Sequence, residues 1–419
     1  VEALAPRALL HSMGMRRPAA LFACCCAGLT CAALCSLNMA VSLYLLSSVF
    51  RGRTLMILGR MAGLAGANIS SAGVAFMDTF CQGGGMAQED SSPDLDTLHV
   101  AYASDAPGFP GLLSSMLSVS RHLVDPGGCV LHVIVPPEDV ERMRDLLSCF
   151  NYELGNLSET PRVIVHEATA LGFNSTDTLK SDYLLGAPRL RKPTVFARLY
   201  LDQYLPTASR VIWLDTDTIV KSDLLPLYRM RMKHAVAAAW VPSFTYVDCF
   251  AQYPELADID PSWTFNSGVL VIDLARWRSE ALAAKAEHWI GKVGGCFGEQ
   301  LALNFALGGR VDPLPWAWNV RELGEEHLAA LQLPCFDAAH VIHFCGFAHL
   351  KPWLHTRNPA FDCLVEPYTP SRPCAALPDD LPDLYRGVQG AGGDACLASH
   401  GGGVADDASG SRKCSVGSP

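Results

Sequence analysis

The sequence predicts an α/β fold with a parallel, doubly wound sheet, on three observations. From residue 98 onward, segments rich in β-branched residues alternate with segments whose apolar residues recur at helical spacing. Residues 211–214 (VIWL) are all apolar, which suits a strand buried on both faces. The chain has 419 residues, half of them hydrophobic, which is enough for one large domain with appendages.

The first half of this domain alternates between strands and helices. Residues 111–123 carry apolar side chains at helical spacing, and Pro137 stands at the favoured first turn of a helix that we expect to reach residue 147. Strands are expected at residues 98–104, 129–135 and 162–165. This succession predicts parallel strands.

The second half of the domain continues with less regular spacing. The expected elements are a helix over about residues 194–204, strands at 211–214, 235–240 and 265–273, and a helix at 298–307. Asp273 is a good cap for a helix that follows it. Residues 241–262 form a long aromatic and acidic loop, and a loop of this length inside a compact domain is usually functional.

The N-terminal part predicts a membrane anchor. Residues 19–50 contain no charged side chain and exceed the roughly 20 residues that cross a bilayer as a helix. The apolar part of a cleaved signal is shorter, so we favour a signal-anchor. The expected organisation is a cytosolic tail and anchor at residues 1–53, a linker at 54–97, a catalytic domain at 98–386 and a disordered, glycine-rich tail at 387–419.

Net charge and cysteine spacing argue against some classes of partner, and possible disulfides and glycosylation sequons bear on the cellular compartment. A net charge of -10 without a basic cluster argues against a nucleic-acid surface. Five of the 16 cysteines lie in the apolar run, and the others form no CxxC pair, which argues against a zinc ribbon. Disulfides and the glycosylation sequons at Asn156 and Asn174 would agree with a luminal domain.

Two carboxylates follow the strand at residues 211–214. Asp215 and Asp217 flank Thr216, so they emerge at the carboxyl end of the sheet, where open α/β folds bind ligands. Carboxylates this close repel each other unless a cation lies between them, and Mg²⁺ and Mn²⁺ commonly share such ligands with substrate phosphates. The pattern predicts a site for a metal and a nucleotide. An Asp-x-Asp after a strand is also typical of a polar turn or a helix cap.

Some polar residues in the middle of the domain have two interpretations each. Arg198 interrupts the apolar segment VFARLYL, either as a surface arginine whose stem covers the core or as a donor to nucleotide oxygens. Gln300 and Asn304 lie one helical turn apart and share a face, which is either hydrated or functional.

Two further groups near the end of the domain also remain open. Trp316, Trp318 and Asn319 suit either stacking on a sugar or ordinary packing. In HFCGFAHLKPW, a lone His343 is more often structural than a ligand, Gly346 permits a tight turn, and Lys351 precedes a proline that fixes the backbone. The functional alternative is a third metal ligand and a phosphate-binding lysine.

In this order, the motifs resemble those of the family 8 glycosyltransferases, which include glycogenin, bacterial lipooligosaccharide galactosyltransferases and the plant galacturonosyltransferase-like proteins. The resemblance spans about residues 98–353 and is carried by HVAYASD, ARLYL, LDTD, FNSGVLVIDLARWR, GEQLALN and HFCGFAHLKPW. It implies a single Rossmann-like nucleotide-diphospho-sugar transferase domain of the GT-A type.

The resemblance also implies a role for each motif. Contacts to the nucleotide would come from Ala103, Ser104, Asp105, Arg198, Asp215, Thr216, Asp217 and Lys351. The metal ligands would be Asp215, Asp217 and His343. Facing the donor sugar and the reaction centre would be Asn266, Glu299 and Gln300.

The implied activity is retaining transfer of a hexosyl or uronosyl group from a UDP-sugar to a glycan or polysaccharide acceptor, with Mn²⁺ or Mg²⁺ as cofactor. Together with the anchor, it implies a single-pass type II protein of the Golgi membrane with a luminal catalytic domain. The ARLYL and KPWL segments are most similar to the plant-type branch.

The sequence departs from the family pattern at two places, and these keep rival functions open. Lys351 follows Gly346 two residues later than in the family, and Glu299 stands where many members have Asp. An inactive, membrane-tethered carbohydrate-binding protein is therefore one alternative. A nucleotidyl or phosphoryl transferase is another, although the chain has no Gly-x-x-x-x-Gly-Lys phosphate loop.

Overall fold

The structure is a computed structural model, and it describes residues 89–90, 92, 95–168, 192–242, 263–292, 298–321, 338–346, 351–357 and 361–386. All of them belong to one compact unit, Ser71–Pro419. The predicted anchor, most of the linker, most of the loop at 241–262 and the C-terminal tail lie outside the described residues. Within the described part, no helix has both the length and the apolar character needed to cross a membrane.

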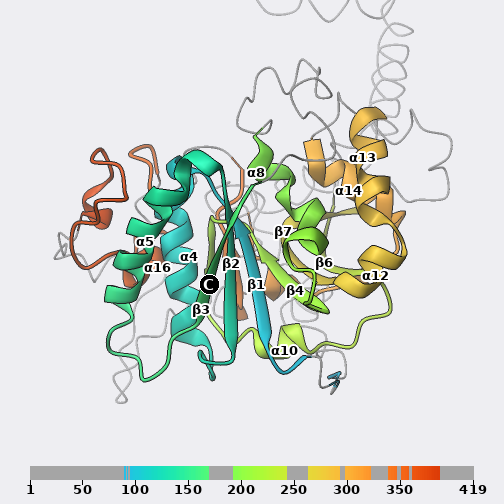
Figure 1. Ribbon diagram of the computed structural model, residues 1–419, viewed down its shortest axis with the longest axis horizontal. Coiled ribbons are helices and arrows are strands. Elements are labelled where there is room, and N and C mark those ends of the chain that lie inside the picture. Colours follow the sequence, from blue (N-terminus) through green and yellow to red (C-terminus); the bar gives the residue numbers. More distant parts are fainter. Residues whose placement is uncertain are drawn as a thin grey trace, which may run out of the picture. The chain divides into compact units, whose positions relative to one another are not determined.

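A seven-stranded sheet forms the centre of the described unit (Figure 1). Its strands are β1 (Leu98–Ala103), β2 (Cys129–Val135), β3 (Arg162–Glu167), β4 (Arg210–Leu214), β6 (Val236–Pro242), β7 (Trp263–Asp273) and β8 (Asp312–Pro313). They are arranged in the order β3-β2-β1-β4-β7-β6-β8. Strands β3, β2, β1 and β4 are parallel, which confirms the pattern predicted for the first half.

Strand β7 runs antiparallel to both of its neighbours, so the prediction of a fully parallel sheet was wrong here. An apolar run such as VLVID indicates burial but carries no information about strand direction. The consequence matters for function. Because β7 is reversed, its first residues, and not its last, lie beside the carboxyl end of β4, where Leu214 pairs with Val269.

Helices cover both faces of this sheet (Figure 1). One layer contains α4 (Phe109–His122) and α5 (Val140–Glu153), and the other contains α12 (Leu274–Ser279), α13 (Leu282–Lys292) and α14 (Gly298–Leu307). Strand β1 contributes to both layers, since Val100 and Tyr102 pack into the first core and Ala101 into the second. Successive side chains of a strand point to opposite faces, so a strand covered on both faces is apolar over most of its length.

Short elements complete the described part. They are η2 (Ala106–Gly108), η3 (Pro137–Asp139), α8 (Pro193–Phe196), η5 (Ala197–Tyr200), α9 (Leu201–Tyr204), α10 (Leu225–Tyr228), η7 (Trp316–Trp318), α16 (Asp362–Val365), η11 (Glu366–Tyr368) and η12 (Asp383–Tyr385). Pro137 begins η3, which passes into α5, and the Asp273 carboxylate accepts a hydrogen bond from Arg276 N at 2.9 Å. Both helix starts were predicted.

The single helix predicted over residues 194–204 is instead three pieces, α8, η5 and α9. Residues 196–201 are all buried, so this stretch has no solvent face that would hold it to the regular helical period. Tyr200 leaves helical geometry, with φ −117° and ψ 20°. The break places Arg198 in the interior, where the residue is 6% exposed.

A separate two-stranded sheet joins segments that are far apart in the chain. Strand β5 (Thr218–Val220) pairs antiparallel with β9 (Val341–His343), and Thr218 lies opposite His343. Phe344 N also donates to Asp217 O at 2.8 Å. This pairing carries the histidine to the aspartates that follow β4.

A disulfide fastens the C-terminal described segment to the first helical layer. Cys149 of α5 is bonded to Cys374, 225 residues later. Leu377, Leu381 and Tyr385 follow it into the core. The expectation that the domain contains disulfides is confirmed for this pair.

Three histidines form a hydrogen-bonded row across β1, β2 and β3. His99 Nδ1 lies 3.0 Å from His132 Nε2, and His132 Nδ1 lies 3.0 Å from His166 Nε2. Burial, together with the neighbouring imidazoles, lowers the pKa of His132 to about 3. The central imidazole is therefore neutral in the folded protein near neutral pH.

A candidate metal and nucleotide site

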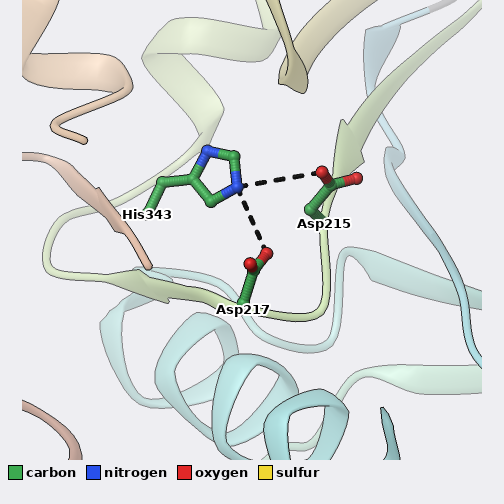
Figure 2. A group of neighbouring side chains, drawn as sticks. All are labelled: Asp215, Asp217 and His343. Atoms are coloured by element: carbon green, nitrogen blue, oxygen red, sulfur yellow. Dashed lines mark ion pairs between the residues drawn. The ribbon is translucent and has the colours of Figure 1, made fainter. Parts of the chain in front are cut away.

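The two aspartates after β4 meet His343 in a cluster at the end of the central sheet. Figure 2 shows the imidazole pointing between the two carboxylates. His343 Nε2 lies 3.2 Å from Asp217 Oδ1 and 3.8 Å from Asp215 Oδ2. One ligand atom from each residue lies within 4.8 Å of the other two. The polar-turn interpretation of Asp-x-Asp does not explain this convergence with a residue 126 positions further along the chain.

Asp215 is fixed from three sides. Its Oδ1 accepts hydrogen bonds from Trp213 Nε1 at 2.9 Å and forms an ion pair with Arg198 Nη2 at 2.9 Å. Its main-chain N–H donates to Gly268 O at 2.8 Å, which ties it to β7. These contacts occupy Oδ1 and leave Oδ2 directed toward His343, so the carboxylate is oriented before any ligand binds.

Asp217 is nearly buried, and its carboxylate contacts Lys351 and His343. Lys351 Nζ donates to Asp217 Oδ2 and, at 2.8 Å, to Phe344 O. Burial alone would raise the pKa of Asp217, but Lys351 and His343 outweigh it and hold the pKa far below its usual range. The side chain is therefore an anion, as a metal ligand must be.

Lys351 reaches the cluster although its loop is two residues longer than in the family. Gly346 adopts φ 101°, a conformation that a side chain would strain, and so confirms the predicted turn. Trp353 packs against Gly111 of α4, where an added Cβ would lie 2.3 Å from the indole ring. Lys351 and Trp353 both line the cleft.

The start of β7 and helix α14 form the neighbouring wall. Gln300 Oε1 accepts hydrogen bonds from Asn266 Nδ2 and Ser267 N, both at 3.1 Å. Asn304 holds the main chain of Phe265 from both sides, at 3.0 and 3.1 Å. The shared face of Gln300 and Asn304 thus packs on β7 and positions Asn266, which excludes the interpretation of a merely hydrated face.

Arg198 connects this wall to the metal cluster. Its Nη1 donates to Ser267 O at 2.6 Å, and its Nη2 lies 3.6 Å from Glu299 Oε1. Burial raises the pKa of Glu299, and Arg198 opposes that rise. The interpretation of Arg198 as a surface arginine was wrong, because the interior break at η5 turns it toward the site.

The residues after β1 form the opposite end of the site. Ser104 is buried, and its main-chain N–H donates to Ile134 O at 3.0 Å. Asp105 forms an ion pair with Lys192. Gly108 lies so close that an added Cβ would be 2.6 Å from Ser104 Oγ. This end is narrow and polar, with one anion and one cation facing each other.

All twelve predicted site residues line a single cleft of about 510 Å³. They come from six separate segments of the chain that the fold brings together, and their individual roles stay predictions. The cleft is also lined by residues that we did not predict, namely Gly108, Lys192, Thr194, Val195, Trp213, Ser267, Cys345, Gly346 and Trp353. Ser267 could have been found from FNSG, since its hydroxyl directly follows the predicted Asn266 at the same strand end.

Asn319 was considered with Trp316 and Trp318 for sugar stacking or packing but was not among the predicted site residues, and it contacts the metal cluster through His343. It is 1% exposed, and its Oδ1 lies 3.0 Å from His343 Nδ1. The adjacent Trp316 and Trp318 belong to η7, and Trp318 stacks on His340 at 4.3 Å. For Trp318 the packing interpretation holds.

The donor set fits a divalent cation. Two carboxylate oxygens and one imidazole nitrogen are ligands that Mn²⁺ and Mg²⁺ accept, and two of the three side chains are ionised or oriented by neighbours. Gly268 allows the imidazole to approach, because a Cβ there would lie 2.1 Å from His343 Cε1.

The chain matches the family model described as glycosyl transferase family 8 over residues 99–357. It is 28% identical over 301 residues to probable galacturonosyltransferase-like 3 of Arabidopsis thaliana, covering 67% of this chain and 82% of that protein. It is also 28% identical over 204 residues to glycosyltransferase 8 domain-containing protein 1 of Homo sapiens, covering 40% of this chain and 52% of that protein. The chain thus spans about half the length of this human relative.

Two transferases are among the solved structures that superpose on this chain. The galactosyltransferase LgtC, in complex with donor and acceptor sugar analogues, is 20% identical with a TM-score of 0.45, covering 62% of this chain and 90% of that chain. Mouse xyloside xylosyltransferase 1 in its apo form is 17% identical with a TM-score of 0.42, covering 61% of this chain and 99% of that chain.

The family match spans well over half of the chain and includes every predicted site residue, from Ala103 to Lys351. It agrees with the resemblance inferred from the motifs. The chain belongs to glycosyl transferase family 8.

Proposed function

We propose that this protein transfers a hexosyl or uronosyl group from a UDP-sugar to a glycan or polysaccharide acceptor, with retention of the anomeric configuration. One observation carries the proposal. Twelve residues from six separate segments, chosen as donor, metal and sugar contacts, line one cleft of about 510 Å³. Cavities of that size suit a ligand the size of a sugar nucleotide.

The residues that would hold a Mn²⁺ or Mg²⁺ ion are Asp215, Asp217 and His343. When bound, such an ion supplies positive charge at the diphosphate and thereby stabilises the UDP leaving group. Lys351 would add a fixed positive charge on the same side, since its ammonium already lies beside Asp217. Arg198 would act mainly by holding Asp215, because its two terminal nitrogens contact Asp215 and Ser267.

The wall formed by Asn266 and Gln300 is placed to bind the donor sugar. Asn266 and Gln300 are joined to each other at 3.1 Å, and Ser267 N–H also donates to Gln300. Side chains held in this way lose little freedom when they bind hydroxyl groups, which favours orientation of the sugar.

The surroundings of Glu299 bear on whether the transfer proceeds through a covalent sugar–enzyme intermediate. It is buried, and its Oε1 is shared between Ser267 Oγ at 3.3 Å and Arg198 at 3.6 Å. A carboxylate engaged in this way is a poor covalent nucleophile. This favours a path in which the acceptor hydroxyl approaches from the side of the leaving group and transfers its proton to UDP.

The acceptor and the compartment are part of the same proposal. The Arabidopsis relative is named as galacturonosyltransferase-like, and we infer a polysaccharide or glycan acceptor of a secretory pathway. The Cys149–Cys374 disulfide supports an oxidising compartment such as the Golgi lumen. We retain the proposal of a type II membrane protein, whose anchor would lie among residues 19–50.

A panel of UDP-sugars tests the function directly. The full chain is incubated with each UDP-sugar and Mn²⁺, and the release of UDP is followed. We expect release from one or a few donors, loss of release on chelation, and no release from an Asp217→Ala variant. The exposed Glu141 provides a matched control, because Glu141→Gln removes an acidic charge outside the cleft.

The same measurement separates the proposal from its main rival. A protein that only binds carbohydrate would bind UDP-sugars without releasing UDP from any donor, with or without an acceptor. The long loop before Lys351 was the reason to consider this rival. Lys351 nevertheless lies in the cleft, in contact with Asp217 and Phe344.

A further inference from the structure

A chain of side-chain amides links the predicted metal ligand His343 to the wall that faces the donor sugar. Asn319 lies 3.0 Å from His343 Nδ1 on one side and donates to Asn266 Oδ1 at 2.9 Å on the other. Asn266 continues to Gln300 at 3.1 Å. Asn319 and His343 are each 1% exposed, so water does not compete for these bonds.

Main-chain groups determine the direction of every bond in this chain. Gly268 N–H donates to Asn266 Oδ1 at 3.0 Å, and a main-chain N–H can only donate. The atom of Asn319 that contacts the same oxygen must therefore be its NH₂ group. At the far end, Ser267 N–H donates to Gln300 Oε1 at 3.1 Å, which in turn requires the NH₂ group of Asn266 to point at Gln300.

The direction of these bonds sets the state of the histidine. With its NH₂ group committed to Asn266, Asn319 presents its oxygen to His343 Nδ1. That nitrogen must carry a hydrogen, and the neutral ring then has its lone pair on Nε2, the atom that faces Asp215 and Asp217. A metal-binding imidazole needs this tautomer.

The backbone holds Asn319 in place for this contact. The next residue, Val320, donates its N–H to Val341 O at 2.9 Å and accepts from His343 N at 2.8 Å. Asn319 ends η7, with its own N–H donating to Trp316 O at 2.9 Å. The segment is thus tied to β9, the strand that carries the histidine.

We propose that Asn319 is a positioning residue that orients His343 for the metal and, through Asn266 and Gln300, couples the metal ligand to the donor-sugar wall. The inference rests on the proposed metal-dependent function and adds a residue to it. It predicts that the two ends of Asn319 have separable effects, one on metal affinity and one on donor binding.

The test measures Mn²⁺ affinity by electron paramagnetic resonance, using the full chain with UDP and without a sugar donor, so that no turnover is needed. In Asn319→Leu, both bonds are lost at similar side-chain volume. We expect Mn²⁺ to bind about 10- to 100-fold more weakly, the usual effect of removing an outer-shell partner of a metal ligand. Asn319→Asp keeps an oxygen for His343 but sets a second oxygen against Asn266 Oδ1. It should retain Mn²⁺ affinity within about threefold while its donor KM rises about tenfold, as expected for a lost buried hydrogen bond.

Asp312→Leu is the matched control for a general loss of stability. Asp312 is also buried and accepts two main-chain bonds, from Lys233 N and His234 N, both at 2.8 Å. Its strand β8 pairs with the first half of β6, outside the cleft. This variant should melt at a lower temperature than the wild type and bind Mn²⁺ with wild-type affinity.

The outcomes are distinct. A wild-type protein that fails to bind Mn²⁺ with UDP overturns both the proposed function and this inference. A wild type that binds Mn²⁺, with a folded Asn319→Leu that binds it equally well, overturns the inference alone. If Asn319→Leu does not fold, Asn319→Asp decides: an unchanged donor KM, or a loss of Mn²⁺ affinity beyond tenfold, contradicts the coupling.

Discussion

Replacing Gly268 by alanine tests whether the close approach of β7 to His343 positions the metal ligand. An alanine Cβ would lie 2.1 Å from His343 Cε1 and 2.8 Å from both ring nitrogens, whereas ordinary contact begins at 3.4 Å. The imidazole would have to retreat by about 1.3 Å, the difference between the first and last of these distances. Metal–ligand distances tolerate only about 0.2 Å, and a 1 Å misplacement in an active site can reduce the rate about 100-fold.

We therefore expect Gly268→Ala to bind Mn²⁺ about 10- to 100-fold more weakly and to lose at least a comparable factor in Mn²⁺-dependent UDP release. Paramagnetic resonance titration with UDP measures the first quantity, and a coupled UDP assay measures the second. Gly127→Ala is the control, since its Cβ would meet only the end of the Glu159 side chain, which can move away. A folded Gly268→Ala with wild-type Mn²⁺ affinity would refute the reasoning.

Four further predictions address separate parts of the molecule. Asp217→Asn removes a metal ligand's charge at constant shape, and UDP release should fall by more than about 100-fold, beyond the effect typical of outer-shell residues. Lys351→Met removes a positive charge beside Asp217. The kcat should fall about 10- to 100-fold, which corresponds to the roughly 1.5–3 kcal/mol of a hydrogen bond to a charged group. The affinity for Mn²⁺ should change less than kcat does. The double variant Cys149→Ser, Cys374→Ser opens a link that spans 225 residues, and the free energy of unfolding in urea should fall by about 2–5 kcal/mol without a change in Mn²⁺ affinity. His132 has a pKa of about 3 in the folded protein against an ordinary value of 6.5. As the pH falls, the unfolded chain therefore binds a proton at His132 before the folded protein does. Relative to His132→Gln, the free energy of unfolding should fall by about 1.4 kcal/mol per pH unit between pH 6.5 and pH 3.

Each of these predictions has a contrary result. Full turnover in Asp217→Asn would show that Asp217 is not needed for the reaction. Unchanged kcat in Lys351→Met would show the same for Lys351. Equal urea midpoints with and without the Cys149–Cys374 link would show that the C-terminal segment is held by its apolar contacts alone. An identical pH dependence of stability in wild type and His132→Gln would contradict the neutral central imidazole.

The parts of the fold that could be predicted are those encoded locally. Strands β1, β2 and β4 are apolar except for His99, His132 and Arg210, and strands covered on both faces are typically apolar over most of their length. The cap at Asp273 was predicted because a carboxylate before a helix satisfies main-chain donors in any context. These features depend on a few neighbouring residues.

The parts that were missed depend on distant contacts. The reversal of β7 and the pairing of β5 with β9 join segments by register, and three-residue strands such as Thr218–Val220 have too few side chains to specify a partner. Position alone favoured a surface site for Arg198, because nothing in VFARLYL reveals the break at Tyr200, and only the family resemblance assigned it to the nucleotide.

The site was nevertheless more predictable than the topology. Its residues lie at strand ends and helix starts, and binding a metal or a nucleotide there requires particular polar side chains that can be recognised in the sequence. The contacts of Asn319 with the site were missed because they run to His343 and Asn266, 24 and 53 positions away along the chain.

The central claim is that Asp215, Asp217 and His343 bind one cation that contacts the diphosphate of a UDP-sugar. Anomalous diffraction at the manganese edge, from crystals grown with Mn²⁺ and UDP, tests it most directly. We predict one peak in the cleft, with an oxygen of each aspartate, His343 Nε2 and diphosphate oxygens within about 2.5 Å. A peak that is coordinated without His343, or UDP bound in the cleft with no cation between it and the aspartates, would contradict the claim.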